Sequence, residues 1–314
     1  MIRILCLNPT IDRMYYIEGF NAGNQYHGNC PDTYPGGKGI NIARVLSNYQ
    51  VKAIVYAFVG GATGKKIEEE ISRIGQKGVY FWHEGETRST INVMDRKNNR
   101  ETEITESGAK ITKEQQEKFL RRLESDIEEG DLVICSGLPA NGMDYDIYKQ
   151  VSNICYKKDA KCFVDANREY LANSFPGRYS FAKPNENELK SLFSVEKDMT
   201  EKEILICGQK LLQLGVEVVL VSMGSEGAIA ITKNACFKVD IPKVNVVSTI
   251  GSGDSSVAGF CVGIIEGKGI QECLKLSMAF GVVNAMHAEV GYVTPVEVEG
   301  IIKKIDIQVL GSEL

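Results

Sequence analysis

The 314-residue sequence contains no stretch of apolar residues long enough to cross a membrane, since such a span needs roughly 18 to 20 of them. It also has no surplus of basic residues, because 36 Lys and Arg stand against 41 Asp and Glu, a formal charge of −5. A broad nucleic-acid surface normally makes a domain basic, so we expect neither a nucleic acid nor a membrane as partner. Residues 1–9 lack the basic head, apolar stretch and cleavage site of a signal peptide, and we expect a cytoplasmic protein.

The nine cysteines contain no C-x-x-C pair and no regular spacing, so the sequence offers neither a zinc framework nor a secreted disulfide scaffold. Most of them stand among apolar neighbours, as Cys135 does after Val133 and Ile134. We therefore expect reduced thiols in a core. With 43% hydrophobic and 25% charged residues, the composition is that of a globular chain rather than a disordered one. The cysteines stand at positions 6, 30, 135, 155, 162, 207, 236, 261 and 273.

Short apolar β-branched runs alternate with amphipathic stretches, which is typical of an α/β protein with a mostly parallel sheet. Helices flank the sheet in this class, and the sheet is open. Buried strands are expected at residues 2–7, 53–58, 131–135, 161–164 and 217–221. Helices are expected at residues 38–49, 64–75, 112–127, 143–156, 200–214 and 253–266, with Thr112 as an N-cap.

Two polar segments, residues 13–34 and 88–107, interrupt this rhythm with strand-like patterns and no helix. In the second, residues 89–95 and 101–105 alternate around a polar turn, which predicts a hairpin with one solvated face. We interpret the two segments as a small β-sheet lid over the carboxyl edge of the main sheet; two decorated loops are the alternative. No linker or repeat divides the rest, so a single domain is expected over residues 1–314.

A glycine cluster, Pro35-Gly36-Gly37-Lys38-Gly39-Ile40-Asn41, precedes an apolar helical stretch. Its glycines free the backbone to approach a ligand, and the helix N-terminus favours an anion or hydroxyl groups. Lys38 adds a mobile positive charge, and Asn41 adds a donor and an acceptor. A plain glycine turn with a solvated lysine is the alternative. A dinucleotide-binding oxidoreductase fits poorly, because Ile42 stands where its third glycine belongs.

Another cluster contains Gly251-Ser252-Gly253-Asp254 and leads into an apolar helix. Such a turn presents successive backbone N–H groups to one point, with the helix dipole behind them, and so stabilises developing negative charge. Beside it, Asp254 suits a general base that takes a proton from an attacking hydroxyl. The alternative is an Asp that only caps the helix.

Two further turns follow predicted strands. The turn from Ser222 to Gly227 lies where a buried strand ends, at the ligand-binding edge of a parallel sheet. Lys183-Pro184-Asn185 follows a shorter strand and opens a helix. Asn185 and Glu188 share one face of that helix and could hold Mg²⁺ through its waters, while an N-cap with its capping-box partner is the alternative.

Taken in this order, these residues resemble the ribokinase-like sugar kinases, the phosphofructokinase B family, and most of all its branch of 1-phosphofructokinases and tagatose-6-phosphate kinases. The resemblance runs from Leu7-Asn8-Pro9-Thr10-Ile11-Asp12-Arg13 to about Val293. The block from Gly36 to Leu46 matches the first signature of that branch, and Ser248 to Ser255 matches the second. The resemblance implies a ribokinase-like sheet with a β-sheet lid.

The resemblance also implies roles for single residues. Asp12, the Gly36-Gly37 backbone and Asn41 would hold sugar hydroxyls, and Lys38 and Arg88 would meet the phosphate that the substrate carries. Asp254 would be the general base, with Gly251, Ser252 and Gly253 as the anion hole for the transferred phosphoryl group. The ATP site would contain Lys183, Asn185, Ser222, Gly224, Ser225, Gly227, Gly253 and Asn284, with Asn185 and Glu188 supporting Mg²⁺ through water.

The implied activity is ATP-dependent phosphorylation of a ketohexose monophosphate to a 1,6-bisphosphate. Fructose 1-phosphate is the expected substrate, tagatose 6-phosphate the alternative, and a non-catalytic sugar or nucleotide sensor on the same fold a remote one. The resemblance also admits a monovalent cation and a homodimer joined through the lid. Two departures fall near the substrate pocket: Gln25 stands where relatives carry Arg, and Ser136-Gly137-Leu138-Pro139 is one residue shorter than their Ser-Gly-Ser-Leu-Pro.

Overall fold

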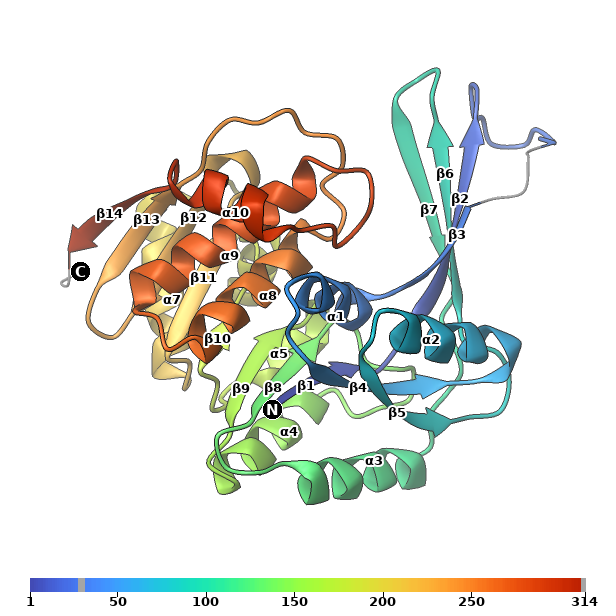
Figure 1. The fold of residues 1–314 in the computed structure, drawn as a ribbon, viewed down its shortest axis with the longest axis horizontal. Helices are drawn as coiled ribbons and strands as arrows, with labels where there is room; N and C mark the ends of the chain where they lie inside the picture. The colour runs from blue at the N-terminus through green and yellow to red at the C-terminus, as the bar shows by residue number, and fades with distance from the viewer. Residues whose placement is uncertain (28–31, 312–314) are drawn as a thin grey trace.

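The computed structural model describes residues 1–27 and 32–311. A ten-stranded sheet forms the body, and a four-stranded sheet projects from it (Figure 1). The order in the large sheet is β14-β13-β12-β11-β10-β9-β8-β1-β4-β5, parallel from β5 to β11 and antiparallel from there to β14. Its strands are β1 (Ile2–Cys6), β4 (Ala53–Val59), β5 (Lys77–Trp82), β8 (Leu132–Ser136), β9 (Lys161–Asp165), β10 (Phe181–Ala182), β11 (Val218–Ser222), β12 (Ala228–Thr232), β13 (Cys236–Asp240) and β14 (Asp306–Gly311).

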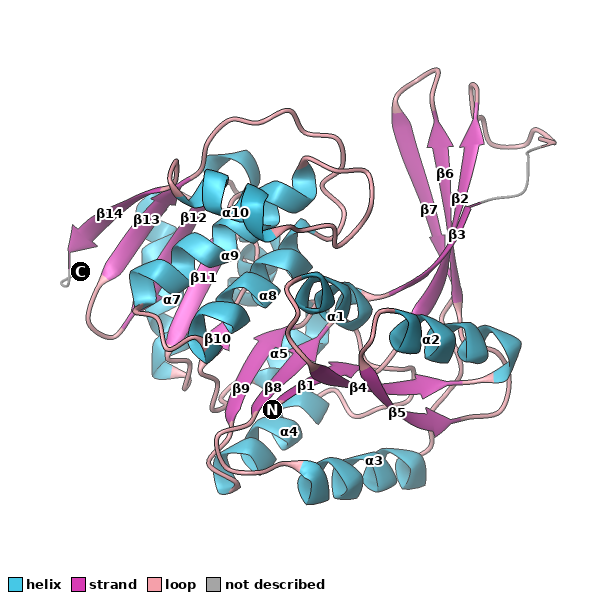
Figure 2. Ribbon diagram, in the orientation of Figure 1, coloured by secondary structure: helices cyan, strands magenta, loops and turns pink. Residues whose placement is uncertain are grey.

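Helices cover both faces of the large sheet (Figure 2). Along β11, Leu220 belongs to one core while its neighbours Val219 and Val221 belong to the other, because successive strand residues point to opposite faces. The first core holds residues of α1 (Lys38–Asn48), α2 (Gly61–Arg73), α8 (Ser252–Ile265), α9 (Ile270–Ala285) and α10 (Pro295–Ile302). The second holds residues of α3 (Lys113–Asp126), α4 (Ile147–Lys157), α5 (Arg168–Ser174), α6 (Glu186–Phe193) and α7 (Glu201–Gln213).

The predicted fold class, an open and mostly parallel sheet flanked by helices, is confirmed. Every predicted strand and helix is present, with ends displaced by up to four residues. Thr112 caps α3 as expected, since its side chain accepts a hydrogen bond from the Gln115 N–H at 3.2 Å. No predicted helix covered α9, which is buried along most of its length and so lacks the polar face that gives a helical period.

The four-stranded sheet has the order β3-β2-β6-β7, and its strands include parts of both segments that interrupt the helix–strand rhythm. Its strands are β2 (Thr10–Ile17), β3 (Asp32–Gly36), β6 (Ser89–Asp95) and β7 (Arg100–Thr105). β6 and β7 form the predicted antiparallel hairpin. The expectation of one solvated face is wrong for β7, which is exposed at every residue because it is an edge strand that projects from the body. Residues 28–31 of the first segment lie outside the described part of the chain.

The eight cysteines that the structure describes are free and buried, as the apolar neighbours of most of them predict. Cys30 lies outside the described residues. Within residues 1–27 and 32–311, no helix is both long and apolar enough to cross a bilayer.

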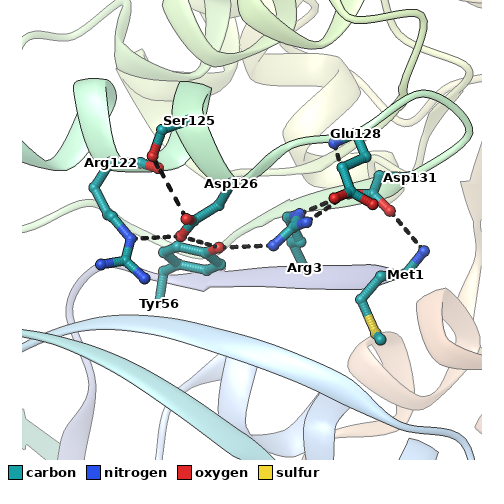
Figure 3. Close-up of polar contacts among 8 residues, drawn as sticks. All are labelled: Met1, Arg3, Tyr56, Arg122, Ser125, Asp126, Glu128 and Asp131. Atoms are coloured by element: carbon teal, nitrogen blue, oxygen red, sulfur yellow. Dashed lines mark hydrogen bonds and ion pairs between the residues drawn. The ribbon is translucent and has the colours of Figure 1, made fainter.

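A buried polar network joins the first strands of the sheet to α3 (Figure 3). The guanidinium of Arg3 donates to Asp131 from Nε at 2.8 Å and to the Tyr56 hydroxyl from NH1 at 2.9 Å. Tyr56 in turn donates to Asp126 at the end of α3, and the Met1 ammonium lies 2.6 Å from Asp131. Because Arg3 and Asp131 are 6% and 3% exposed, this network is a buried charge pair whose partners depend on one another.

Candidate functional site

The predicted site residues gather at the edge of the large sheet where its parallel strands end. Lys183 directly follows β10, and Ser222 ends β11. Lys38 begins α1, shortly after β3. Asp254 stands in the first turn of α8. In open α/β sheets this carboxyl edge is where ligands bind.

Asp254 is a buried carboxylate held by an amide, and it does not cap its helix. Gly251, with a positive φ of 78°, is the N-cap of α8 and leaves the Asp254 side chain free to turn toward α1. There its Oδ2 accepts a hydrogen bond from Asn41 Nδ2 at 2.8 Å. Burial raises the pKa of Asp254 to about 6, and the nearby Asp165 carboxylate adds to this, against Lys38, Asn41 and Lys183. A carboxylate with this pKa is charged at neutral pH and can accept a proton.

The glycine turn before Asp254 is fixed by Asn284, which comes from α9. The Asn284 Nδ2 donates to the Ile250 carbonyl at 2.8 Å and to the Ser252 Oγ at 3.1 Å, while its Oδ1 accepts from the Gly291 N–H at 2.8 Å. Asn284 is only 1% exposed. The structure therefore places this predicted nucleotide-site residue behind the turn, where it orients the backbone.

Lys38 and Lys183 flank a buried carboxylate, Asp165, that the sequence interpretation missed. Lys38 Nζ lies 3.2 Å from both oxygens of Asp165, and Lys183 Nζ lies 3.8 Å from one of them. Burial opposes the charge of Lys38, yet Asp165, Asp254 and Glu188 hold its pKa above the usual value. Asp165 ends β9 as a polar residue after a buried apolar run, which is the signal that could have identified it.

The shorter turn noted in the sequence lies against this pair. The Gly137 N–H donates to the Asp165 carbonyl at 3.0 Å, and a Cβ on Gly137 would lie 3.5 Å from the Lys38 Cβ. Such a distance is an ordinary van der Waals contact, so this turn packs directly against the stem of Lys38. Gln25, the other departure, is exposed in the loop between β2 and β3.

Asp12 and Arg88 lie at the base of the small sheet, and Asp12 faces the first glycine cluster. A Cβ on Gly36 would collide with the Asp12 carboxylate, so only glycine allows this approach. Burial raises the pKa of Asp12 to about 6, although the charges of Arg88 and Arg44 oppose the rise. Arg88 donates to the Asn8 carbonyl from Nε at 3.3 Å and from NH2 at 3.2 Å. A carboxyl group and a guanidinium thus lie within electrostatic range of each other where the small sheet joins the body.

Asn185 and Glu188 form a capping box, which was the alternative to metal binding. The Asn185 Oδ1 accepts from the Glu188 N–H at 2.8 Å, and a Glu188 oxygen accepts from the Asn185 N–H at 2.9 Å. The other Glu188 oxygen accepts from Asn167 Nδ2 at 3.0 Å, a contact that the sequence interpretation also missed. Each oxygen retains a lone pair, so the capping box leaves room for a hydrated cation.

An open groove of ≈ 510 Å³ lies beside this helix start. Of the predicted nucleotide-site residues, Asn185, Ser222 and Gly224 line it, while Ser225 and Gly227 do not. A Cβ on Gly227 would collide with the Val239 carbonyl, so this glycine serves the close approach of two strands. The remaining residues that line the groove are Glu186, Asn187, Lys190, Asp198, Met199 and Met223.

Comparison with known proteins agrees with the two signatures. The family profile "pfkB family carbohydrate kinase" matches residues 1–296. A 1-phosphofructokinase of Bacillus subtilis is 32% identical, over 93% of this chain and 94% of its own, and a tagatose-6-phosphate kinase of Staphylococcus epidermidis is 33% identical, over 98% and 99%. In the fold, phosphofructokinase-2 from Escherichia coli in complex with potassium matches with a TM-score of 0.89 at 22% identity, covering 96% of this chain and 98% of that one.

Proposed function

Because the chain belongs to the pfkB family of carbohydrate kinases and is an ATP-dependent kinase, we propose that it phosphorylates a ketohexose monophosphate to a 1,6-bisphosphate. Fructose 1-phosphate is the first candidate substrate. Tagatose 6-phosphate is the second, because similar relatives are named for each of the two activities. The observation that carries the proposal is the buried carboxylate of Asp254, which lies beside a glycine turn and interacts electrostatically with Lys38 and Lys183.

The sugar phosphate would lie between the small sheet and the start of α1. Asp12, Asn41 and the Gly36-Gly37 backbone offer acceptors and donors for hydroxyl groups. Lys38 and Arg88 offer positive charge for the phosphate that the substrate already carries. This arrangement supports a phosphorylated sugar over a free one, since the half-buried Arg88 donates to a carbonyl rather than to a carboxylate and a bound phosphate would compensate its charge.

The transfer step needs alignment and charge neutralisation more than covalent help from the protein. A new bond forms between the sugar oxygen and the γ-phosphorus of ATP, the bond from that phosphorus to the bridging oxygen of ADP breaks, and the proton of the hydroxyl passes to Asp254. A positioned base of this kind contributes about 10²–10⁴-fold. The backbone of Gly251, Ser252 and Gly253 would neutralise the transferred group, with Lys183 close by, since a Cβ on Gly253 would lie 3.3 Å from its Nζ.

The residues present fit a magnesium ion held mainly by phosphate and water. In the described part of the chain no group of three His, Cys, Asp or Glu side chains could enclose a metal, which suits Mg²⁺ because it keeps several of its waters. Glu188 and Asn185 would hold it through water at the groove of the nucleotide. When bound, Mg²⁺ neutralises phosphate charge. A monovalent cation stays a prediction, to be tested by adding K⁺ to the assay.

The small sheet would act as a lid on a single kinase domain and could pair with that of a second copy. Its free edge β7 and the exposed Tyr16, Tyr34 and Ile104 support such a dimer. Sedimentation of the purified protein tests this. A monomer at micromolar concentration would contradict it.

An assay of ADP release decides the function. We expect turnover with fructose 1-phosphate, and the assay should compare tagatose 6-phosphate, fructose 6-phosphate and the free sugars. Asp254→Asn should nearly abolish turnover while leaving ATP binding largely intact, because the amide cannot accept the proton. Near-normal kcat in this variant would refute the assignment, and nucleotide binding without turnover in the wild type would favour the sensor.

A further inference from the structure

Arg44, in the middle of α1, contacts its own helix and three other segments with one side chain, although it belongs to none of the roles assigned so far. Its NH1 donates to the Asn41 Oδ1 at 3.2 Å and to the Val290 carbonyl at 3.4 Å. Its NH2 donates to the Pro35 carbonyl and to Glu70 Oε1, both at 2.9 Å. The residue is 9% exposed. Only a planar guanidinium, with five donors in a fixed geometry, can satisfy all these acceptors together.

The contact with Asn41 decides which end of that amide faces the carboxylate. A guanidinium has only donors, so it can face only the oxygen of the Asn41 side chain. The NH₂ group must then point away from Arg44, and it donates to Asp254 at 2.8 Å. Asn41 is itself buried, and both ends of its amide are used in this way. Without Arg44 the amide could turn and present an oxygen to the Asp254 carboxylate.

The other contacts of Arg44 bring the borders of the site together. Pro35 precedes Gly36 at the end of β3, so this bond fastens an edge strand of the small sheet to α1. Val290 precedes Gly291, whose N–H is bound by Asn284, the residue that holds the glycine turn of α8. A single side chain therefore connects the base, the small sheet and, through Asn284, the anion-binding turn.

Glu70 of α2 keeps this guanidinium in place. It accepts from Arg44 and, on its outer side, from Arg73 at 2.7 Å. Burial works to raise the pKa of Glu70, but the bonds from Arg73 and Arg44 outweigh it and hold the pKa below its usual value. The Glu70 carboxylate is thus a permanent counter-charge, 7% exposed, with one buried and one exposed arginine.

We propose that Arg44 is a positioning residue, which orients the Asn41 amide toward Asp254 and fastens the end of β3 to the catalytic edge. The inference rests on the proposed function, in which Asp254 is the base. Several other groups also face Asp254: Lys38 from α1, Asp165 from β9, Lys183 after β10 and the Cys6 thiol of β1. These groups remain in place when position 44 is changed, so a change at Asp254 can be traced to Asn41.

Arg44→Lys is the informative variant, because lysine keeps the charge beside Glu70 and so preserves folding. It cannot reach Asn41, Pro35 and Val290 together. We expect kcat to fall by about 10- to 100-fold, as is usual when a reacting group is misplaced, with the KM for ATP changed less than about twofold. The acid limb of the kcat profile should move upward by about half a pH unit or more, because a hydrogen bond to the charged form of Asp254 is lost.

Two controls separate positioning from mere stability. Arg73→Met removes the exposed arginine from the same Glu70 and should leave kcat and the pH profile unchanged. Asn41→Ala combined with Arg44→Lys should cost no more than the larger single change, because the two residues act through one contact. Wild-type kcat and pH profile in Arg44→Lys, or additive effects in the double variant, would overturn the inference.

The proposed function fails on different results. It fails if the wild type does not turn over any sugar phosphate, or if Asp254→Asn remains active. The Arg44 inference still has a readout then, since the carboxyl of Asp254 can be titrated by ¹³C NMR in aspartate-labelled protein and assigned with Asp254→Asn. An upward shift of its pKa in Arg44→Lys supports the inference, and an unchanged titration overturns it.

Discussion

Lys38 Nζ lies 3.2 Å from both carboxylate oxygens of Asp165, so its positive charge at the catalytic edge of the sheet is already paired with a negative one. Lys183 shares the same carboxylate. Asp165 and Lys183 are almost fully buried while Lys38 is partly exposed, and buried charges are stable only while each has a partner. A phosphate that binds here can pair with Lys38 while Lys183 remains paired with Asp165. The catalytic edge of the sheet can therefore accept an anion, although the whole chain carries a charge of −5.

Lys38→Ala should therefore weaken binding of the sugar phosphate and preserve the fold. We expect its KM to rise by about 10- to 100-fold, since a charge-assisted hydrogen bond is worth roughly 1.5–3 kcal/mol. The KM for ATP should change far less. Steady-state kinetics with each substrate varied in turn measures both. Lys65→Ala, on the exposed side of α2, is the control, and equal rises in the two KM values would contradict the role of Lys38.

The sequence predicts the α/β class and both signature turns because they depend on local patterns. The position of Asp165 has a local signal at the end of β9, but its pairing with Lys38 and the contacts of Arg44 escape that kind of analysis, since they join segments that lie far apart in the chain. The same limit applies to Asn284, whose place behind the turn of α8 depends on the packing of α9 against α8. The periodicity of strands and helices carries no information about contacts between distant segments.

Gly36→Ala should impair the sugar site through Asp12. The added Cβ would collide with the Asp12 carboxylate, and that side chain or the end of β3 must move. We expect the KM for the sugar phosphate to rise by about tenfold or more, because a displacement of about 1 Å at a reacting or binding group can cost 10²-fold. Kinetics with the sugar phosphate and with ATP provides the measurement.

Gly300→Ala is the matched control for this substitution. Gly300 lies in α10, where a Cβ would meet nothing within 4 Å, so alanine should keep activity and slightly raise stability. If Gly36→Ala behaves like Gly300→Ala in both KM values, the close approach of Gly36 to Asp12 has no part in binding.

Glu188→Gln should increase the Mg²⁺ concentration needed for half-maximal rate. Glutamine replaces one carboxylate oxygen with an NH₂ group, which loses negative charge and one of the two acceptor contacts, to Asn167 or to the Asn185 N–H. The outer partners of a metal site commonly contribute 10- to 100-fold. A Mg²⁺ titration of the initial rate at fixed ATP measures the change.

The chain itself offers the control for Glu188. Glu203 forms an equivalent capping box with Thr200 at the start of α7, and neither residue lines the groove. Glu203→Gln should lose a similar amount of helix stability, without any effect on the Mg²⁺ requirement. If the two variants show the same Mg²⁺ dependence, Glu188 acts only as a cap.

Asp254→Asn should stabilise the protein at neutral pH while it removes activity. Burial raises the pKa of Asp254 to about 6 from its usual 3.8. The folded state therefore binds this proton more tightly than the unfolded state, and wild-type stability falls as pH rises from about 4 through about 6. About two pKa units correspond to roughly 1–3 kcal/mol. Urea denaturation at pH 4 and pH 8 should show a gain only at pH 8; a loss there would contradict it.

Asp131→Asn should cost stability in the opposite pH range, through the network in Figure 3. The pKa of Asp131 lies below its usual value: burial works against this, but bonds from the Glu128 N–H, the Met1 ammonium and Arg3 prevail. Such a carboxylate contributes stability above its unfolded pKa and loses it as pH falls through the folded one. The deficit of Asp131→Asn should therefore be full at pH 7 and shrink below about pH 4.

The size of the stability loss in Asp131→Asn follows from the burial of Arg3, which keeps only Tyr56 as a strong partner once the charge at Asp131 is removed. Breaking a buried pair from one side costs about 3–5 kcal/mol. Arg122→Ala is the control, because Arg122 bonds Asp126 at the exposed end of the same network and its loss should cost far less stability. Equal losses in the two variants would mean that the Arg3–Asp131 pair is no stronger than a surface ion pair.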